Sequence, residues 1–231
     1  RGMKKMNFDF SFVPNYLPYY FEGVKYTLLI SLITVFFGAL FGSLLFFMKT
    51  SNFHIWKIKP LKIIAVVYIE IIRGTPMLLQ ILIMYAGSKM FFGIDLSPFT
   101  SAVIAIALNS AAYVSEIVRA GIEAVDKGQM EAARSLGMKK STAMMLIVIP
   151  QAVKNILPAI GNEFVAIIKE SSMASIIGVN ELMFAGKVVV GSTYLGLEPY
   201  IVAAVFYFIM TFTLGRIISL IERRMKKSDS R

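Results

Sequence analysis

The chain has 231 residues, of which 57% are hydrophobic and 16% are charged, and its formal net charge is +10. Soluble domains are about 45–50% apolar and about 25% charged, so this composition disfavours a soluble domain and indicates a membrane protein. The absence of cysteine excludes disulfides, thiolate metal sites and a cysteine nucleophile. The one histidine, His54, has no ligand partner near it in the sequence, so no metal site is predicted. In a membrane protein the distribution of positive charge indicates which loops face the cytoplasm, so the net charge is not taken as a sign of a nucleic-acid partner.

Residues 1–23 are predicted to form an N-terminal segment outside the cell or at the outer interface. Arg1 and Gly2 precede Met3 and are interpreted as an expression remnant. Residues 7–23 are rich in Phe, Tyr and Pro, which is typical of an amphipathic segment lying on a membrane surface. The apolar run that follows is longer than a signal-peptide core and has no small-residue cleavage site after it, so we expect it to be retained as a span.

Five segments have the approximately 20 mostly apolar residues that a spanning helix needs. They are residues 24–48, 61–86, 98–118, 144–169 and 199–221. Gly74-Thr75-Pro76 interrupts the second segment, and Pro150, Pro158 and Gly161 interrupt the fourth, so we expect both helices to be broken there. The sequence therefore predicts an all-α membrane protein with five transmembrane helices in one domain, residues 24–221.

Basic residues are unevenly distributed between the connections. The first and third connections and the C-terminal end are rich in Lys and Arg, whereas the second and fourth connections contain only Lys89 and Lys187. Loops with many basic residues stay in the cytoplasm. We therefore predict an external N-terminus, a cytoplasmic loop at residues 119–143 and a basic cytoplasmic tail at residues 222–231.

The cytoplasmic loop contains the run Glu131-Ala132-Ala133-Arg134, followed by Gly137. Glu and Ala favour a helix, and glycine permits the left-handed conformation in which many helices end. We expect two short helices that meet at Gly137, the second beginning near Ser141. A solvated turn in which Glu131 pairs with Arg134 explains the spacing equally well.

Several motifs in this chain resemble one family of transport proteins. Glu131-Ala132-Ala133, Gly137 and the downstream Ile156-Leu157-Pro158 are similar to the EAA loop of ABC importer permeases. Five further motifs resemble the polar amino-acid branch, which includes histidine, glutamine, arginine and cystine importers. They are Glu70–Pro76, Tyr113–Arg119, Lys127–Gln129, Pro150–Ala152 and Asn162–Phe164. The resemblance extends from about residue 16 to residue 224.

The resemblance implies a type I ABC importer permease fold in a bacterial cell membrane. The implied function is import of a polar amino acid by alternating access, with a basic amino acid or cystine favoured. The implied partners are a second permease chain, with a homodimer favoured, two cytoplasmic ABC ATPase subunits and an extracellular substrate-binding protein. The coupling residues implied for the ATPase contact are Glu131, Ala132, Ala133, Arg134 and Gly137.

No phosphate-binding loop of the type G-x-x-x-x-G-K is present in the sequence. Gly186-Lys187 resembles the end of one, but Glu181 occupies the position of its first glycine. We therefore expect no catalytic residue and no cofactor in this chain, with ATP and Mg bound by the partner ATPase.

Polar side chains within the spans are candidates for contact with the substrate, because they are costly in a membrane. Pro76 lacks an N–H and leaves a carbonyl near Ile72 without its helical partner, and such broken helices can hold charged substrate groups. The family resemblance extends a substrate role to Thr75, Gln80, Tyr113, Asn162, Glu163, Ser171 and Ser172. At the interruption of the second span, a structural ion pair between Glu70 and Arg73 is the alternative to a substrate role. At the end of the fourth span, the alternative is an ion pair between Lys169 and Glu170.

Two other functional classes fit the composition less well. An intramembrane enzyme needs a nucleophile–base pair or a metal site, and the sequence offers neither. An ion-coupled amino-acid transporter acting alone usually has more spans and an internal repeat. Small residues in the third span, such as Ala105 and Ser110, indicate close helix packing, either at a dimer interface or in the translocation core.

Overall fold

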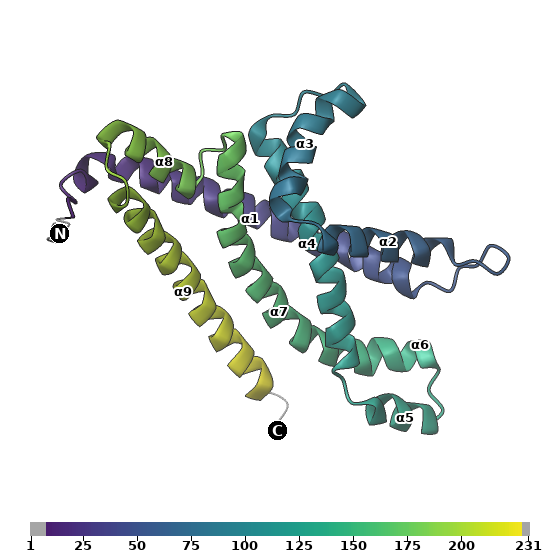
Figure 1. The fold of residues 1–231 in the computed structure, drawn as a ribbon. Helices are drawn as coiled ribbons and strands as arrows, with labels where there is room; N and C mark the ends of the chain where they lie inside the picture. The colour runs from purple at the N-terminus through teal and green to yellow at the C-terminus, as the bar shows by residue number, and fades with distance from the viewer. Residues whose placement is uncertain (1–7, 228–231) are drawn as a thin grey trace, which may run out of the picture.

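The computed structural model describes residues 8–227, whose backbone is helical apart from connections and one isolated β-bridge between Ile55 and Ile58. The α-helices are α1 (Val13–Thr50), α2 (Pro60–Gly74), α3 (Met77–Phe92), α4 (Pro98–Glu123), α5 (Lys127–Ser135), α6 (Lys140–Ala143), α7 (Ile149–Glu170), α8 (Leu182–Thr193) and α9 (Glu198–Lys227). A π-helical segment, Met144–Val148, joins α6 to α7, and a 3-10 segment, Ser171–Ile177, follows α7. Figure 1 shows their arrangement.

Helix α1 is uninterrupted from Val13 to Thr50, so the first span begins eleven residues before the predicted residue 24. Tyr20, in the segment assigned to the outer interface, is fully buried, and its hydroxyl donates to the carbonyl of Pro199 at 3.0 Å. Tyr19 and Phe21 on either side are exposed. Residues 1–7 of the predicted N-terminal segment and residues 228–231 of the predicted tail lie outside the described residues.

Four helical stretches within residues 8–227 are long and apolar enough to cross a membrane. They are α1, α4, the composite stretch Lys140–Ile177, and Glu198–Met225 of α9. Helices α2 and α3 meet the criterion only as a pair, bent by 108° at the break between them. The predicted interruption at Gly74-Thr75-Pro76 is therefore confirmed, and the five predicted spans correspond to four helices and one sharply bent pair.

The fourth predicted span is a continuous helical stretch, and the expected break at Pro150, Pro158 and Gly161 is wrong. Helix α7 includes all three residues. Pro150 follows the π-helical segment, whose wider turn accommodates a proline ring, and the hydrogen bond lost at a buried proline such as Pro158 is tolerated in packed membrane helices. A Cβ on Gly161 would lie 2.9 Å from Ile218, so this glycine permits close approach of α9.

Helix α4 lies at the centre of the fold and contacts α1, α2, α3 and α7. Its contact with α1 is close because small residues face one another: a Cβ on Gly38 would lie 2.6 Å from Ser110 Oγ. A Cβ on Gly42 would lie 2.8 Å from the carbonyl oxygen of Ala111. The small residues of the third span therefore pack against this chain's own α1, as expected for helices held together by van der Waals contact.

Replacing Gly42 by valine is expected to destabilise the protein. The new side chain meets backbone in α4, which cannot move aside, and overpacking of this kind costs about 1–3 kcal/mol. Thermal unfolding of the purified protein in detergent measures the effect. Gly215→Ala is the matched control because a Cβ at Gly215 meets nothing within 4 Å. Equal unfolding temperatures for the two variants would contradict the packing argument.

Helices α8 and α9 cover the first half of α1. Tyr20, Leu182, Val189 and Ala203 form a buried cluster between the three helices. Helix α8, with 12 residues, was not expected from the sequence. On the opposite side, α9 exposes large apolar side chains, including Phe208 and Phe212, which fits contact with lipid or another chain.

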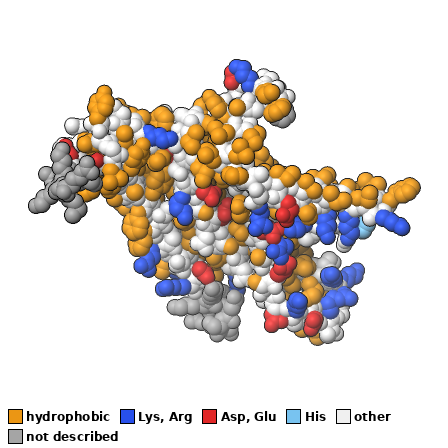
Figure 2. Space-filling view, viewed as in Figure 1, with side chains coloured by type: hydrophobic (Ala, Val, Ile, Leu, Met, Phe, Trp, Pro, Cys, Tyr) orange, Lys and Arg blue, Asp and Glu red, His pale blue; other side chains and the backbone are white. Residues whose placement is uncertain are grey.

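Basic side chains gather at one end of the molecule. Figure 2 shows Lys and Arg over the α1–α2 connection and over α5 and α6, with acidic and basic side chains mixed on the surface between them. The same arrangement was the basis for predicting that these loops face the cytoplasm.

Candidate coupling and translocation site

The loop predicted to be cytoplasmic folds as two short helices, α5 and α6, that meet at a glycine. Asp126 caps α5, its carboxylate accepting from the N–H of Gly128 at 2.6 Å. At the other end Gly137 has φ +84°, and the N–H of Met138 bonds to the carbonyl of Ala133 at 3.1 Å. This left-handed cap confirms the predicted stop at Gly137, and the second helix begins at Lys140, one residue before the predicted Ser141.

The two alanines of the motif have different environments. Ala133 is 2% exposed and faces inward, where α5 packs on the π-helical segment, whereas Glu131 and Ala132 are exposed. Leu136 is 85% exposed, which is unusual for a leucine beside a helix cap. Arg134 donates to the carbonyl of Met138 at 2.9 Å, and no ion pair with Glu131 is present in the described chain. Helix α5 therefore presents a carboxylate outward, and Leu136, directly after the helix, presents an apolar side chain.

Gln80 bridges the break between α2 and α3. Its amide nitrogen donates to the carbonyl of Ile72 at 2.8 Å, the carbonyl that Pro76 leaves without a helical partner. The same nitrogen lies 2.9 Å from Thr75 Oγ1, and Thr75 in turn donates to the carbonyl of Ile71. Two predicted substrate residues, Thr75 and Gln80, thus stabilise the broken helix in this conformation.

The break packs against α4 through two further contacts. Asn109 donates to the side-chain oxygen of Gln80 at 2.9 Å and is almost completely buried. The guanidinium of Arg73 lies over the ring of Tyr113, 5.6 Å from its centroid. The alternative in which Arg73 pairs with Glu70 is not observed, because no ion pair between them occurs within residues 8–227. Thr75, Gln80 and Tyr113 are therefore brought to one place.

Glu163 and Asn162 lie on α7, one turn beyond Pro158. Glu163 is half-buried beside Ser110 of α4, while Asn162 is exposed. No hydrogen bond of the Asn162 side chain occurs within the described part of the chain. A carboxylate at the contact of α4 and α7 can accept from an ammonium or guanidinium group.

Ser171 and Ser172 begin the 3-10 segment. Ser171, fully buried, donates to the carbonyl of Ile168 at 2.9 Å, and Ser172 donates to that of Lys169 at 2.6 Å. Both hydroxyls are thus engaged in ending α7. The proposed ion pair between Lys169 and Glu170 is not observed among the described residues.

Sequence reasoning missed a buried carboxylate at the start of α8. Glu181 is fully buried and accepts from the N–H groups of Met183 and Phe184 at 2.9 and 2.8 Å. It also accepts from the hydroxyl of Tyr207 in α9 at 2.5 Å. Thr27 of α1 accepts from the N–H of Leu182 next to it. The available signal was an acidic residue directly before a short apolar run.

Sequence reasoning also missed an ionic cluster where α1 meets α4. Lys49 bonds to Glu116 at 2.6 Å, and Arg119 bonds to Glu116 at 2.9 Å and to Glu123 at 2.5 Å. The spacings from Glu116 to Arg119 and from Arg119 to Glu123 are the helical i, i+3 and i, i+4 spacings. Lys49 joins the cluster only through the tertiary packing of α1.

Comparison with known families decides the class of this protein. The family described as binding-protein-dependent transport system inner membrane component matches residues 50–227. The chain belongs to this family. It is therefore an inner membrane component of a transport system, and the predicted multi-pass membrane location is confirmed.

Curated relatives of this chain are named as permease proteins of amino-acid transport systems. The chain is 41% identical, over 97% of its length and 100% of the relative's, to the arginine transport system permease protein ArtQ of Bacillus subtilis. It is 36% identical over 96% of its length, and 99% of the relative's, to the glutamine transport system permease protein GlnP of Escherichia coli. As predicted, these relatives are permease subunits rather than enzymes.

Solved structures confirm the predicted type I ABC importer permease fold. An amino acid ABC transporter crystallised with histidines matches with a TM-score of 0.89 and 48% identity, covering 95% of this chain and all of the other. The MetNI methionine ABC transporter shares the fold at a TM-score of 0.74, with 18% identity and coverage of 93% and 98%.

Proposed function

We propose that this chain moves a polar amino acid into the cytoplasm by alternating access, driven by two ABC ATPase subunits that dock on α5. The observation that supports this most directly is the outward-facing surface of α5 and its glycine cap, where Glu131 makes no ion pair within residues 8–227 and Leu136 is exposed. An extracellular binding protein supplies the substrate, and ATP and Mg belong to the ATPases.

The coupling helix is connected to the substrate path through rigid elements. Helix α5 follows α4 and is packed on the π-helical segment before α7, and α4 and α7 contact each other. Glu163 lies on α7 and the α2–α3 break packs on α4. A displacement of α5 by the ATPase therefore shifts both walls of the proposed substrate path together, as in switching by rigid-body rotation.

The substrate path is proposed to run between the α2–α3 break and α7. Thr75, Gln80 and Tyr113 define one side and Asn162 and Glu163 the other, with Ser171 and Ser172 at the end of α7. Because Gln80 and Thr75 already hydrogen-bond to the backbone of α2, we assign them to shaping the path. The charge of Glu163 favours a cationic or zwitterionic amino acid, and arginine and glutamine are the substrates named for the relatives.

Glu163→Gln is expected to lower transport of a basic amino acid much more than transport of a neutral one. A hydrogen bond to a charged group contributes about 1.5–3 kcal/mol, which corresponds to a ~10- to ~150-fold loss for arginine. Uptake of labelled arginine and glutamine into proteoliposomes, with the ATPase and binding protein present, measures this ratio.

Glu170→Gln is the matched control, since it removes a carboxylate seven residues further along the same helix. It should leave the arginine-to-glutamine ratio unchanged. Equal effects of the two substitutions, or unchanged arginine uptake in Glu163→Gln, would show that Glu163 does not meet the substrate's charge.

A second copy of the chain is the proposed permease partner. The exposed apolar side chains of α9, such as Phe208, Ile209 and Phe212, supply an apolar surface that a second copy or lipid can cover. Size determination of the purified complex by light scattering, corrected for detergent, tests the stoichiometry. A complex with one permease chain, or with two different ones, would contradict the homodimer.

A further inference from the structure

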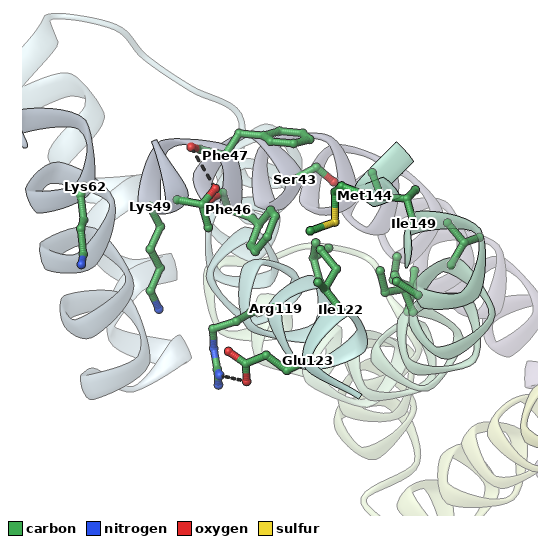
Figure 3. Close-up of a pocket in the computed structure, with 16 residues that line it drawn as sticks. Ser43, Phe46, Phe47, Lys49, Lys62, Arg119, Ile122, Glu123, Met144 and Ile149 are labelled. Carbon is green, nitrogen blue, oxygen red and sulfur yellow. Dashed lines mark hydrogen bonds and ion pairs between the residues drawn. The ribbon is translucent and has the colours of Figure 1, made fainter. Parts of the chain in front are cut away.

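A cavity of about 710 Å³ lies apart from the proposed substrate path, between the ends of α1 and α4 and the beginning of α7 (Figure 3). Its volume falls within the range of about 300–1,000 Å³ usual for ligand sites. Its walls are mainly apolar. They include Phe46, Phe47, Ile122, Met144, Ile149, Val153, Ile156 and Ile160. None of the predicted substrate residues lines it.

Charged side chains occupy one side of this cavity. Figure 3 shows Lys49, Lys62, Arg119 and Glu123 there, while Met144 and Ile149 lie on the other side. Lys49 and Arg119 are paired with carboxylates. Lys62 has no acidic partner within residues 8–227, so its ammonium group is available to an anion in the cavity that it lines.

The connection between α1 and α2, residues 51–59, adds a second feature of the same surface. No acidic residue occurs from Lys49 to Lys62, a stretch that also contains Lys57 and Lys59. Two reciprocal hydrogen bonds between Ile55 and Ile58 close a tight turn. At its tip Trp56 is 96% exposed with φ +58°, a left-handed conformation that is rare for a bulky side chain.

Exposed aromatic and lysine side chains side by side are typical of the membrane–water interface. Phe53, Ile55 and Ile58 on either side of Trp56 are also more than half exposed. An aqueous loop gains nothing from exposing these groups, whereas the interfacial region of a bilayer accommodates both the rings and the ammonium groups.

We propose that this cavity and the turn at residues 51–59 bind an anionic diacyl phospholipid of the cytoplasmic leaflet. An acyl chain occupies the apolar wall and the phosphate lies near Lys62. Charge complementarity selects an anionic headgroup, because the leaflet facing basic loops carries anionic lipids. The apolar wall selects a lipid over a free phosphate, which would leave it unfilled. The leaflet follows from the orientation that the proposed function assumes.

The lipid site lies next to the segments that connect α5 and α6 to the membrane helices, so a bound lipid can affect coupling. Glu123 is the last residue of α4 and Met144 is the first of the π-helical segment, so the cavity is bounded by both arms that hold α5 and α6. A lipid seated there contacts both arms. Its occupancy therefore stabilises the frame on which the coupling helix rests.

Native mass spectrometry of the purified permease–ATPase complex tests binding directly. The complex is titrated with phosphatidylglycerol or phosphatidylcholine of the same acyl chains. Wild-type protein is expected to retain phosphatidylglycerol preferentially, and Lys62→Gln to reduce its retention about fivefold, the effect of one cation at an anionic surface. Arg224→Gln, which removes an exposed cation from the end of α9, is the matched control and should retain as much as wild type.

Equal retention of the two lipids, or equal retention by Lys62→Gln and Arg224→Gln, would overturn the proposal. Displacement of phosphatidylglycerol by inorganic phosphate at constant ionic strength would also overturn it, since the site would then recognise only the anion. These readouts do not involve transport, so their failure is distinct from a failure of the proposed function.

Trp56 provides an independent test, because it is the only tryptophan in the chain. The fluorescence of the complex is compared with that of a Trp56→Phe complex, and the difference isolates Trp56. Phosphatidylglycerol with brominated acyl chains is expected to quench this difference signal at least twice as strongly as brominated phosphatidylcholine. Equal quenching by the two lipids, or none by either, would show that the turn at residues 51–59 is not part of the lipid site.

Discussion

Glu131→Arg is expected to abolish the coupling of ATP hydrolysis to transport. Glu131 is exposed on α5, its side chain makes no ion pair within the described chain, and α5 is the proposed docking helix. Loss of one partner of a buried interfacial charge pair costs about 2–5 kcal/mol, which is at least a ~30-fold loss in affinity. Co-purification of the ATPase and substrate-stimulated ATP hydrolysis in proteoliposomes both measure the effect.

The isolated permease should tolerate this substitution, because the exposed Glu131 side chain makes no ion pair among the described residues. Its unfolding temperature is expected to equal that of the wild type. Asp95→Arg is the matched control: it reverses another exposed carboxylate, in the surface pair with Lys89 at the end of α3, which lies far from α5 (Figure 1). Such pairs contribute about 0–1 kcal/mol. Normal ATPase binding and coupling by the Glu131→Arg protein would exclude α5 as the docking helix.

Replacement of Glu181 by leucine is expected to cause the largest loss of stability. The substitution leaves two backbone N–H groups and the Tyr207 hydroxyl buried without an acceptor, at about 1–3 kcal/mol each. The sum is about 3–9 kcal/mol, enough to separate α8 from α9 or to prevent folding. Thermal unfolding in detergent and the yield of monodisperse protein measure it.

Glu181→Gln separates the hydrogen bonds from the charge. Its side-chain oxygen can still accept from the N–H groups that begin α8, so it should retain most of the stability that the leucine variant loses. Glu22→Leu is the control for an acidic residue replaced by leucine, since Glu22 is exposed on α1 close to the same helices. Similar unfolding temperatures for Glu181→Leu and Glu22→Leu would contradict a structural role for the buried carboxylate.

Features that depend on a few consecutive residues were predictable from the sequence. The stop of α5 at Gly137 depends on one residue that adopts a positive φ at low cost, and the break after Gly74 depends on one proline. The positions of the apolar segments follow from the length needed to cross a bilayer. The order of several short motifs along the chain indicated the family, which the comparisons confirmed.

The tertiary structure decided which polar groups meet. Nothing local in the sequence indicates that Gln80 satisfies the carbonyl freed by Pro76 and also bonds to Asn109, because one partner is eight residues away and the other twenty-nine. From the sequence we predicted that Pro158 breaks the fourth span. In the structure α7 continues through Pro158. Whether a proline breaks a membrane helix depends on neighbours that can satisfy the freed groups.

The motif of the proposed coupling loop shows both contributions. The sequence by itself determined where a helix over Glu131-Ala132-Ala133 would stop, at Gly137, because helix propensity and the glycine cap act over a few residues, but it left a solvated turn as an equal alternative. Only the tertiary structure decided that Ala133 faces this chain while Glu131 and Leu136 face outward, and that Glu181 binds Tyr207. Side-chain burial and long-range hydrogen bonds depend on how distant helices pack, and single-sequence patterns do not encode that packing.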